Sequence, residues 1–287
     1  MTTKSKYTQD LSTIPILRDA MFEHTRSYSS WGADYSITTL LNPPRIVQLN
    51  KRYGEFFNQL PIDHDFIKDN LGSFRGTAIH DHFEKMLYRY INKHPNAGYL
   101  IERRCWDRIN GRKISGKFDC YLNKALYDIK TTSVWKKLFG DFEDYTKQLN
   151  MYAWMLKQMD IEVNVLFILA WYMDWQKTKV YEKGYPKQEV EQIHIEDIWS
   201  ESTQKEYLYS RIDVQKANEG RPDNELDPCS EKEMWAKDEK WAVYTVSQSW
   251  KAATDPLPEK ATRLFNSRED AEIYMASTKP KRGYGYH

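Results

Sequence analysis

The sequence of 287 residues lacks the features of a membrane protein or of a protein from an oxidising compartment. Its longest apolar run, Val165 to Met173, is far too short to span a bilayer, and its polar N-terminus has no apolar segment of the signal-peptide kind. It has only three cysteines and no Cys-x-x-Cys pair, which agrees with a reducing compartment and excludes a four-cysteine iron–sulfur cluster within one chain. We therefore expect a cytoplasmic protein with no membrane partner and no iron–sulfur cluster.

An excess of charge is also missing, since 42 basic residues oppose 41 acidic ones and leave a net charge of +1. Bulk charge therefore does not indicate a nucleic-acid-binding protein, and any binding groove must come from local clustering of basic residues. Aromatic residues are abundant instead, with ten Trp and twenty Tyr. Some of them are candidates for base-stacking platforms, although packing in the core or on the surface is the commoner use of such side chains.

One stretch, residues 116–152, carries the clearest chemical pattern. Its first part predicts a β-hairpin whose second strand covers 125–132, and within that strand Asp128 and Lys130 are spaced to share one face. Asp119 on the neighbouring strand supplies a second carboxylate. Such hard oxygen ligands suit one or two Mg²⁺ or Mn²⁺ ions, which retain waters and phosphate oxygens as further ligands. The metal can activate a water, and Lys130 is placed to orient that water or to neutralise developing negative charge.

Asp-x-Lys alone is a weak signal, because a chain of this length contains about one by chance. A second copy, Asp238-Glu239-Lys240, lies in the charged segment 231–240 with no preceding apolar strand. We interpret this second copy as part of a solvated segment. The strand context therefore selects Asp128 and Lys130 as the candidate site.

A predicted helix over 78–91 precedes the hairpin and has apolar residues at helical spacing. His80 and Glu84 are four residues apart in it, so an imidazole and a carboxylate share one face and could join the metal site or hold a water there. His82 points elsewhere, which disfavours a zinc site made by His80 and His82. A surface or capped histidine is the simpler interpretation of His80 when it is considered alone.

A second amphipathic helix is predicted over 141–159, after the hairpin. Gln148 and Tyr152 are again four residues apart on one face of this helix. An amide and a phenol can make directed hydrogen bonds to a sugar-phosphate backbone without adding charge. The simpler alternative for Tyr152 is a core position, like those of Leu149 and Leu156.

The four segments form an ordered set: Gly-Thr-x-x-His-x-x-x-Glu over 76–84, Gly-x-x-Asp over 116–119, Asp-x-Lys over 128–130 and Gln-x-x-x-Tyr over 148–152. In this order and with these gaps they resemble the RecB-like branch of the PD-(D/E)XK nuclease superfamily, in its phage and bacterial exonuclease type without an iron–sulfur cluster. The resemblance covers residues 72–175. It implies a restriction-endonuclease-like core and, for a phage-encoded protein, a location in the host cell cytoplasm.

The resemblance also implies roles for individual residues. Metal ligands would come from three side chains and one backbone carbonyl, those of His80, Asp119, Asp128 and Ile129. Catalysis would depend on one amine, which assists the attacking water, and on three acids: Lys130, Asp119, Asp128 and Glu84. Support of the site and binding of the substrate would fall to Gln148 and Tyr152.

The remaining patterns predict a mixed α/β fold in which a mixed central sheet is flanked by helices. Residues 35–49 predict a short helix capped by Ser36 and a second helix that begins at Pro44, and residues 54–71 predict a loop. Two strands joined by the turn Asn110-Gly111 would place Asp119 in the middle of the sheet. Three further elements follow, a buried strand, an edge strand and a long charged helix: 163–173, 189–195 and 198–218.

We expect two domains. The nuclease domain would cover 1–219, with N-terminal helices over 1–71 and the catalytic core over 72–219. A linker begins at Gly220, and 220–287 would form a small C-terminal ββα appendage with strands over 241–246 and 261–265. The basic and aromatic tail, 279–287, could bind phosphate and stack on bases, or it could be disordered.

The sequence therefore predicts a Mg²⁺- or Mn²⁺-dependent deoxyribonuclease that hydrolyses phosphodiester bonds. The resemblance favours an exonuclease that processes DNA ends in recombination, repair or replication. The alternatives are a structure-specific endonuclease and a non-catalytic DNA-binding protein on the same fold, although the latter predicts loss of an acid or of the lysine, and none is lost. DNA is the expected partner, with a recombination or single-strand-binding protein as a further one.

Overall fold

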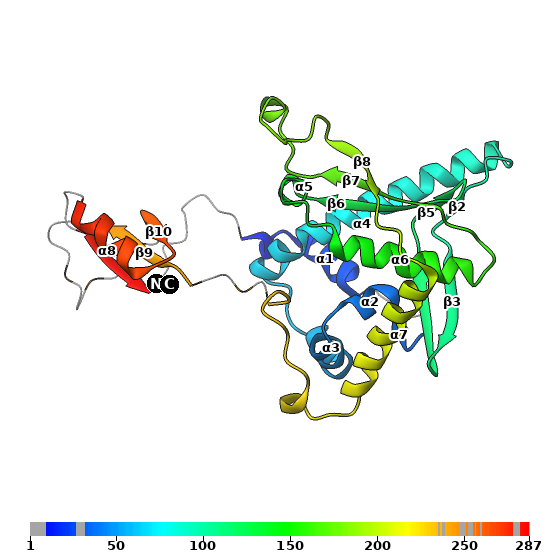
Figure 1. The fold of residues 1–287 in the computed structure, drawn as a ribbon, viewed down its shortest axis with the longest axis horizontal. Coiled ribbons are helices and arrows are strands. Elements are labelled where there is room, and N and C mark those ends of the chain that lie inside the picture. The colour runs from blue at the N-terminus through cyan, green and yellow to red at the C-terminus, as the bar shows by residue number, and fades with distance from the viewer. Residues whose placement is uncertain are drawn as a thin grey trace. The chain divides into compact units, whose positions relative to one another are not determined.

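The computed structural model describes residues 10–26, 32–234, 236, 239–246, 251, 255, 257–258, 260–277 and 282–286. The chain separates into two compact units, Met1–Pro228 and Cys229–His287, and each is described by itself. Figure 1 labels the helices and strands of both units.

The first unit contains a five-stranded sheet in the order β2-β5-β6-β7-β8 (Figure 1). Its strands are β2 (Leu100–Ile101), β5 (Cys120–Leu122), β6 (Ala125–Thr132), β7 (Val165–Tyr172) and β8 (Val190–Ile195). The central pair, β6 and β7, runs parallel over eight residues, and the other neighbouring strands are antiparallel. The predicted mixed sheet and its edge strand β8 are therefore confirmed, whereas β7, predicted as a buried strand, buries only alternate residues.

Two helices cover the opposite faces of this sheet, α4 (His64–Lys93) and α6 (Glu143–Lys157) (Figure 1). The alternation of β6 separates them, because neighbouring side chains of a strand point to opposite faces. Lys130 hydrogen-bonds to Gln148 of α6, whereas the adjacent Thr131 lies against Gly76 of α4. The Asp128 and Lys130 side chains thus share the α6 face of the sheet.

A second, three-stranded sheet has the order β1-β4-β3, from β1 (Tyr35–Ser36), β4 (Arg112–Lys117) and β3 (Arg104–Ile109). The β3–β4 hairpin turns at Asn110 and Gly111, whose φ angles of 49° and 77° are both left-handed, as a two-residue primed turn requires. The predicted turn is confirmed.

The two long strands expected around this turn are interrupted, however. They break after Ile101 and after Lys117, so the hairpin belongs to one sheet and the short strands β2 and β5 to the other. At the break Glu102 adopts a left-handed φ of 48°, and its N–H donates to the carbonyl of Asp119 at 2.8 Å. Asp119 was expected on a strand in the middle of the sheet, but it occupies the gap between β4 and β5.

The N-terminal helices are α1 (Pro15–Arg26), α2 (Ile37–Leu41) and α3 (Pro44–Phe57), with the short 3₁₀ turn η1 (Leu11–Thr13) before them. Ser36 caps α2 by accepting from Thr39 N at 3.0 Å, as the sequence predicted. The predicted loop over 54–71 was wrong, because α3 extends into it and α4 begins at His64. Asp63 caps α4 through Phe66 N at 2.8 Å, and Ile67 is buried in a small apolar cluster with α1.

The main core surrounds α6, in which nine consecutive residues from Gln148 to Leu156 are buried. The helix packs against the sheet and against α2 and α7 (Glu201–Asn218). Asn150, fully buried, receives a hydrogen bond from Trp199 N at 2.8 Å and donates to the carbonyl of Asp197 at 3.0 Å. A buried amide with both ends satisfied fixes the position of α6 relative to the chain before α7.

The remaining short elements of the first unit are α5 (Val134–Phe139), η2 (Lys177–Lys179) and η3 (Asp223–Glu225). Residues 219–227 belong to this unit, because Arg45 donates to the carbonyl of Leu226 at 3.0 Å and Arg52 pairs with Asp223. The boundary between the units therefore follows Pro228, whereas the sequence placed it after residue 219.

The second unit is a three-stranded antiparallel sheet with the order β10-β9-β11 and one helix. Its elements are β9 (Trp241–Thr245), β10 (Arg263–Phe265), α8 (Arg268–Ser277) and β11 (Arg282–Tyr286). The predicted ββα order is present, and the tail adds a third strand where a flexible segment was expected. Residues 279–281 and 287 of that tail lie outside the described residues. In the described part of the chain, no helix combines the length and the apolar character needed to cross a bilayer.

The contact of Gly76 with Thr131 leads to a stability prediction. A Cβ at Gly76 would meet Thr131 Oγ1 at 2.8 Å, whereas a Cβ at Gly72, one turn earlier in α4, has nothing within 4 Å. We expect Gly72→Ala to raise the free energy of unfolding by up to about 1 kcal/mol, because alanine favours a helix. Gly76→Ala should lower it by about 1–3 kcal/mol through overpacking. Urea unfolding of both variants measures this, and equal stabilisation by both would show that α4 and β6 are not in close contact.

Candidate functional site

Asp119 lies where the five-stranded sheet leaves one edge of β6 uncovered. β5 pairs only with residues 125–127, and beyond that stretch Asp119 Oδ2 accepts a hydrogen bond from Ile129 N at 2.6 Å. The N–H and C=O of one strand residue point to the same side, so the Ile129 carbonyl also faces this edge. The short strand β5 therefore leaves room for a carboxylate beside a backbone amide and carbonyl.

His80 approaches Asp119 from α4. Its Nδ1 lies 3.7 Å from Asp119 Oδ2, and its side chain is 28% exposed. Gly76, one turn earlier, lets this part of α4 lie directly on β6. Burial lowers the pKa of His80, and the Asp128 carboxylate opposes this shift. The imidazole is therefore held in its neutral form, the form that can ligate a metal.

Glu102 completes the cluster, although the sequence analysis did not identify it. One possible ligand atom from each of His80, Glu102 and Asp119 lies within 4.8 Å of the other two. The Glu102 side chain is only 7% exposed and pairs with Lys117. Burial raises the pKa of Glu102, and Lys117 opposes that shift. The only sequence signal for Glu102 is an acidic residue directly after the apolar pair 100–101.

Asp128 and Lys130 form a second group on the α6 face. Lys130 Nζ lies 2.8 Å from Asp128 Oδ2 and donates to Gln148 Oε1 at 3.1 Å. The Asp128 side chain is only 4% exposed and that of Lys130 22%. Burial alone would lower the pKa of Lys130, but Asp128 and Asp119 together raise it. Lys130 is thus a persistent cation at the edge of a largely buried site.

Gln148 and Tyr152 support this lysine from within the core. Tyr152 is 4% exposed and Gln148 8%, so neither presents its side chain to a nucleic-acid backbone as the sequence analysis proposed. The Tyr152 ring fills the space left by Gly116, where a Cβ would come within 2.6 Å of it. Burial raises the pKa of Tyr152, and a hydrogen bond with Gln148 opposes the shift. Gln148 therefore contacts Lys130 directly, and Tyr152 contacts Gln148.

Glu84 lies one turn after His80 in α4, outside the candidate metal-ligating group formed by His80, Glu102 and Asp119. Its charge contributes to the electrostatic environment of Glu102 and Lys117. In the second Asp-x-Lys segment, Asp238 lies outside the described residues, and Lys240 hydrogen-bonds to Asn266 within the second unit.

The donor set suits a hard divalent cation. A neutral imidazole and two carboxylates are ligands for Mn²⁺ or Mg²⁺, and nitrogen is the better ligand for Mn²⁺. Burial, followed by the charge of Asp128, raises the pKa of Asp119. A bound cation would lower this pKa again, because it stabilises the charged carboxylate. Asp128 Oδ2 is buried and, among the described residues, receives no hydrogen bond of good geometry despite its nearness to Lys130. This group of residues therefore could hold a metal ion.

The cysteines offer no comparable donor set. All three are free, and Cys105 and Cys120 are buried. Burial raises the pKa of Cys105 to about 11 and that of Cys120 to about 12. Both are therefore neutral thiols at ordinary pH, and neither lies in the cluster of His80, Glu102 and Asp119.

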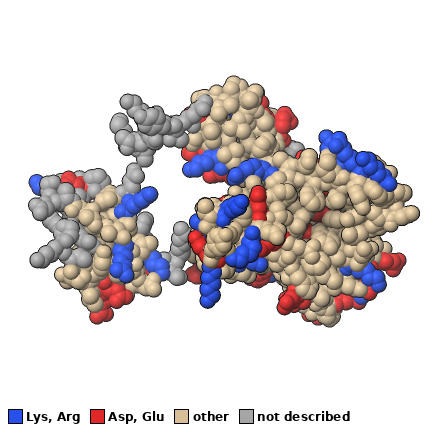
Figure 2. Space-filling view, turned by 90° about the horizontal axis from the view of Figure 1, so that it is seen from above, with Lys and Arg blue, Asp and Glu red and all other residues tan. Residues whose placement is uncertain are grey.

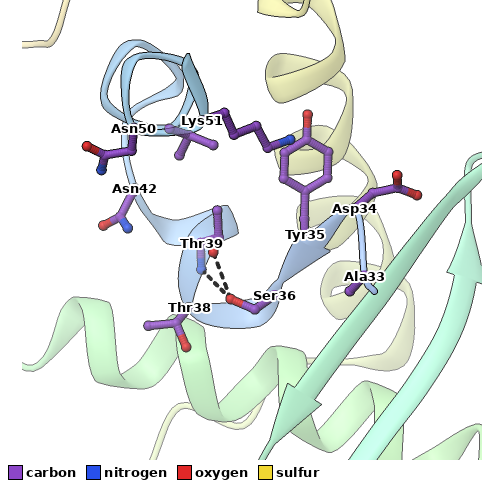
Figure 3. A pocket seen from close by; sticks show the side chains of 10 residues that line it. Ala33, Asp34, Tyr35, Ser36, Thr38, Thr39, Asn42, Asn50 and Lys51 are labelled. Carbon is purple, nitrogen blue, oxygen red and sulfur yellow. Dashed lines mark hydrogen bonds between the residues drawn. The ribbon is translucent and has the colours of Figure 1, made fainter. Parts of the chain in front are cut away.

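A separate hollow of about 440 Å³ lies beside β1 and α2 (Figure 3). Three of its polar side chains make contacts within the protein. Ser36 caps α2, the Tyr35 hydroxyl donates to Glu219, and the Lys51 ammonium lies 3.8 Å from the centre of the Tyr35 ring, toward which it points in Figure 3. These contacts join the N-terminal segment to α7 and the residues after it, so we interpret the hollow as structural.

Comparison with known proteins gives only remote similarities. No family model matches the chain, and no curated protein matches it. The crystal structure of SSO0001 is 20% identical, with a TM-score of 0.47, and the match covers 71% of this chain and 86% of that one. A protein from Eubacterium rectale named "Putative exonuclease" is 14% identical, with a TM-score of 0.31 over 80% of this chain and 82% of that one. Both TM-scores are below 0.5, so the functional argument rests on the residues themselves.

The metal-ligating group predicts which substitutions weaken metal binding. We expect Mn²⁺ to raise the thermal unfolding temperature of the wild type, because a ligand that binds the folded state stabilises it. His80→Ala and Glu102→Gln should each weaken Mn²⁺ affinity by at least about 10- to 100-fold, the loss that removal of a partner outside the ligand shell already causes. Calorimetric titration with Mn²⁺ in the absence of nucleic acid measures this affinity.

The matched control is His82→Ala, two residues from His80 on an exposed face of α4. This variant should bind Mn²⁺ like the wild type. Wild-type affinity in Glu102→Gln would remove Glu102 from the site, and the same result for His80→Ala would leave only ligands from the sheet and its edge.

Proposed function

We propose that this chain is a Mg²⁺- or Mn²⁺-dependent nuclease that hydrolyses phosphodiester bonds in DNA, and that it acts on DNA ends. The observation that carries the proposal is the joint position of two groups. His80, Glu102 and Asp119 offer metal ligands within 4.8 Å of one another, and the charge of Asp119 acts on the partly buried Lys130 that pairs with Asp128. A divalent cation and a fixed ammonium beside it are the parts that phosphodiester hydrolysis requires.

Each residue has a distinct proposed role. Asp119 and His80 would hold the cation with Glu102, and Asp128 would complete the negative charge that attracts it. When bound, the metal would polarise the phosphate and lower the pKa of a water. The Lys130 ammonium, held by Gln148 and Asp128, would stabilise the negative charge that develops on the phosphate.

The sequence motifs support the finer assignment to the RecB-like branch of the PD-(D/E)XK superfamily. The mixed sheet with helices on both faces is compatible with that core. The preference for DNA and for an exonuclease rests on the resemblance of the motifs. On the face shown in Figure 2, Lys and Arg form separate patches interspersed with Asp and Glu, so the charge of that face alone does not identify a nucleic-acid surface.

A non-catalytic DNA-binding role is the weaker candidate. In such a protein nothing would maintain a buried ammonium beside two carboxylates, because a buried ion pair is expensive to desolvate. Here the acids and the lysine are all present, and Asp128 and Lys130 lie within 2.8 Å of each other.

Metal and end dependence can be measured together. We expect the protein to degrade linear double-stranded or single-stranded DNA in Mg²⁺ or Mn²⁺, and EDTA to stop the reaction, because the cation supplies the charge stabilisation. Closed circular DNA should remain intact under the same conditions. Gel analysis of all four substrates, linear and circular in both strand states, separates the alternatives. Cleavage of circles would indicate an endonuclease, and cleavage in EDTA would contradict the metal dependence.

Variants of the Asp-x-Lys segment test the proposed catalytic residues. Asp128→Ala and Lys130→Ala should each lower the cleavage rate by about 100-fold or more, the scale of losing one preorganised charge. Lys130→Ala should still bind DNA, because one phosphate contact is a small part of an interface. Lys240→Ala, in the second Asp-x-Lys segment, is the control and should cleave like the wild type. Full activity in Asp128→Ala would place the chemistry elsewhere.

A further inference from the structure

Helix α5 carries a pair of exposed aromatic rings directly after the strand that bears Lys130 (Figure 1). Trp135 and Phe139 are four residues apart and therefore share one side of the helix. Their rings are stacked, with centroids 5.8 Å apart and planes inclined by 20°. Trp135 is 60% exposed and Phe139 77%, so much of their apolar surface faces solvent.

The helix that carries this pair lies close to the proposed reaction centre. Two ammonium groups lie near the Tyr145 ring of α6, since Lys130 Nζ is 5.2 Å and Lys136 Nζ 4.8 Å from its centroid. The two nitrogens are therefore no more than about 10 Å apart. Because Lys136 is the neighbour of Trp135 in the same short helix, the aromatic pair projects from an element adjacent to Lys130.

Helix α5 is also fixed in place. Asp174, after β7, accepts hydrogen bonds at 2.7 Å from both Ser133 Oγ and Val134 N at the start of the helix. Gly140 ends the helix with a left-handed φ of 66°, a common helix terminus. The rings therefore project from a short helix that is anchored to Asp174 at its start and capped at its end, and little ordering is needed before they bind a ligand.

Charge complementarity indicates the ligand. Lys136 and Lys137 accompany the rings on α5, and their ion pairs with Asp141 and Glu191 are long, at 3.6 and 3.5 Å. A phosphate oxygen can compete with such pairs. Exposed aromatic faces with ammonium groups beside them match a single-stranded nucleic acid, whose bases stack on rings while its phosphates bind cations.

We propose that Trp135 and Phe139 form a stacking platform for unpaired bases next to the phosphodiester bond that is cleaved. The preferred substrate is then single-stranded DNA or a frayed DNA end. The proposal deepens the proposed function and rests on it for the position of the cleaved bond. The base-stacking role itself can be measured without cleavage.

Binding should be measured in a Lys130→Ala background, which keeps the oligonucleotide intact. The probe is a fluorescently labelled oligothymidine of about 12 nucleotides, within the usual range of single-strand site sizes. Trp135→Ala with Phe139→Ala should raise the Kd in fluorescence anisotropy by about tenfold or more, which corresponds to the loss of stacking on one or two bases. Trp135→Phe should retain most of the affinity because an aromatic face remains.

The matched control is Phe56→Ala with Phe57→Ala, a second exposed pair of neighbouring rings on α3. These side chains are 58% and 51% exposed, and their centroids are also 5.8 Å apart. The control should leave the Kd unchanged. The dependence of the Kd on salt should be the same in the platform variant and its parent, because no cation has been removed.

An abasic probe separates stacking from other roles of α5. An oligonucleotide of the same length, with bases missing at successive positions, keeps every phosphate. The parent protein should bind this probe more weakly than oligothymidine when the missing bases are those that would stack on the platform. The Trp135→Ala, Phe139→Ala variant should bind both probes alike. Equal Kd values for the platform variant and its parent on oligothymidine would overturn the proposal.

Two further outcomes have defined meanings. Loss of a dimer in the platform variant by sedimentation, with the Kd for oligothymidine unchanged, would overturn the proposal and assign the rings to self-association. Platform-dependent binding by a wild-type protein that cleaves no DNA would reject the proposed nuclease function and support the stacking platform. A wild-type protein that cleaves DNA, together with a platform variant that binds oligothymidine as its parent does, would support the proposed nuclease function and overturn the stacking platform.

Discussion

The ion pair between Asp128 and Lys130 is the interaction on which the candidate site depends. An ammonium and a carboxylate 2.8 Å apart, with the carboxylate 4% exposed, lose much of their hydration, and apolar side chains of similar size would often be as stable. Asp128 lies on β6 beside the buried Ile168 of β7. An apolar neighbour of this kind offers the carboxylate no hydrogen bond in place of the water that it loses. Gln148 accepts a hydrogen bond from the lysine and holds it in place. Such an arrangement is better explained by chemistry at the site than by the stability of the fold.

The candidate site draws its residues from both faces of the sheet. Asp128 and Lys130 face α6, whereas His80 comes from α4 on the other face. Asp119 can act with both groups because it lies in a gap between strands, beside the open edge of β6 at Ile129. A carboxylate inside a regular strand would be committed to one face. The interruption of the strands is therefore the feature that brings a metal-ligating group and a fixed cation together.

Rigid support surrounds the candidate site. Nine consecutive residues of α6 are buried, and the amide of Asn150 anchors this helix to the chain before α7. Gly116 makes room for the Tyr152 ring, which holds Gln148 and through it Lys130. Positions fixed by packing and by a second layer of hydrogen bonds are what a preorganised reaction centre needs. In contrast, α5 presents its aromatic pair to solvent, as a surface that contacts substrate would.

The sequence by itself determined what depends on spacing within one element. A spacing of two residues in a strand places Asp128 and Lys130 on one face. Capping and turn residues predicted where several helices begin and where the β3–β4 hairpin turns, because these effects act over a few bonds. Only the tertiary structure decided which residues from different elements meet. Glu102 joins His80 and Asp119 because of a left-handed residue and the register of two short strands, neither of which leaves a local sequence pattern. That His80 and Asp128 come from opposite faces of the sheet has the same origin, since the face of a sheet that a helix covers is set by packing and not by the sequence of either element.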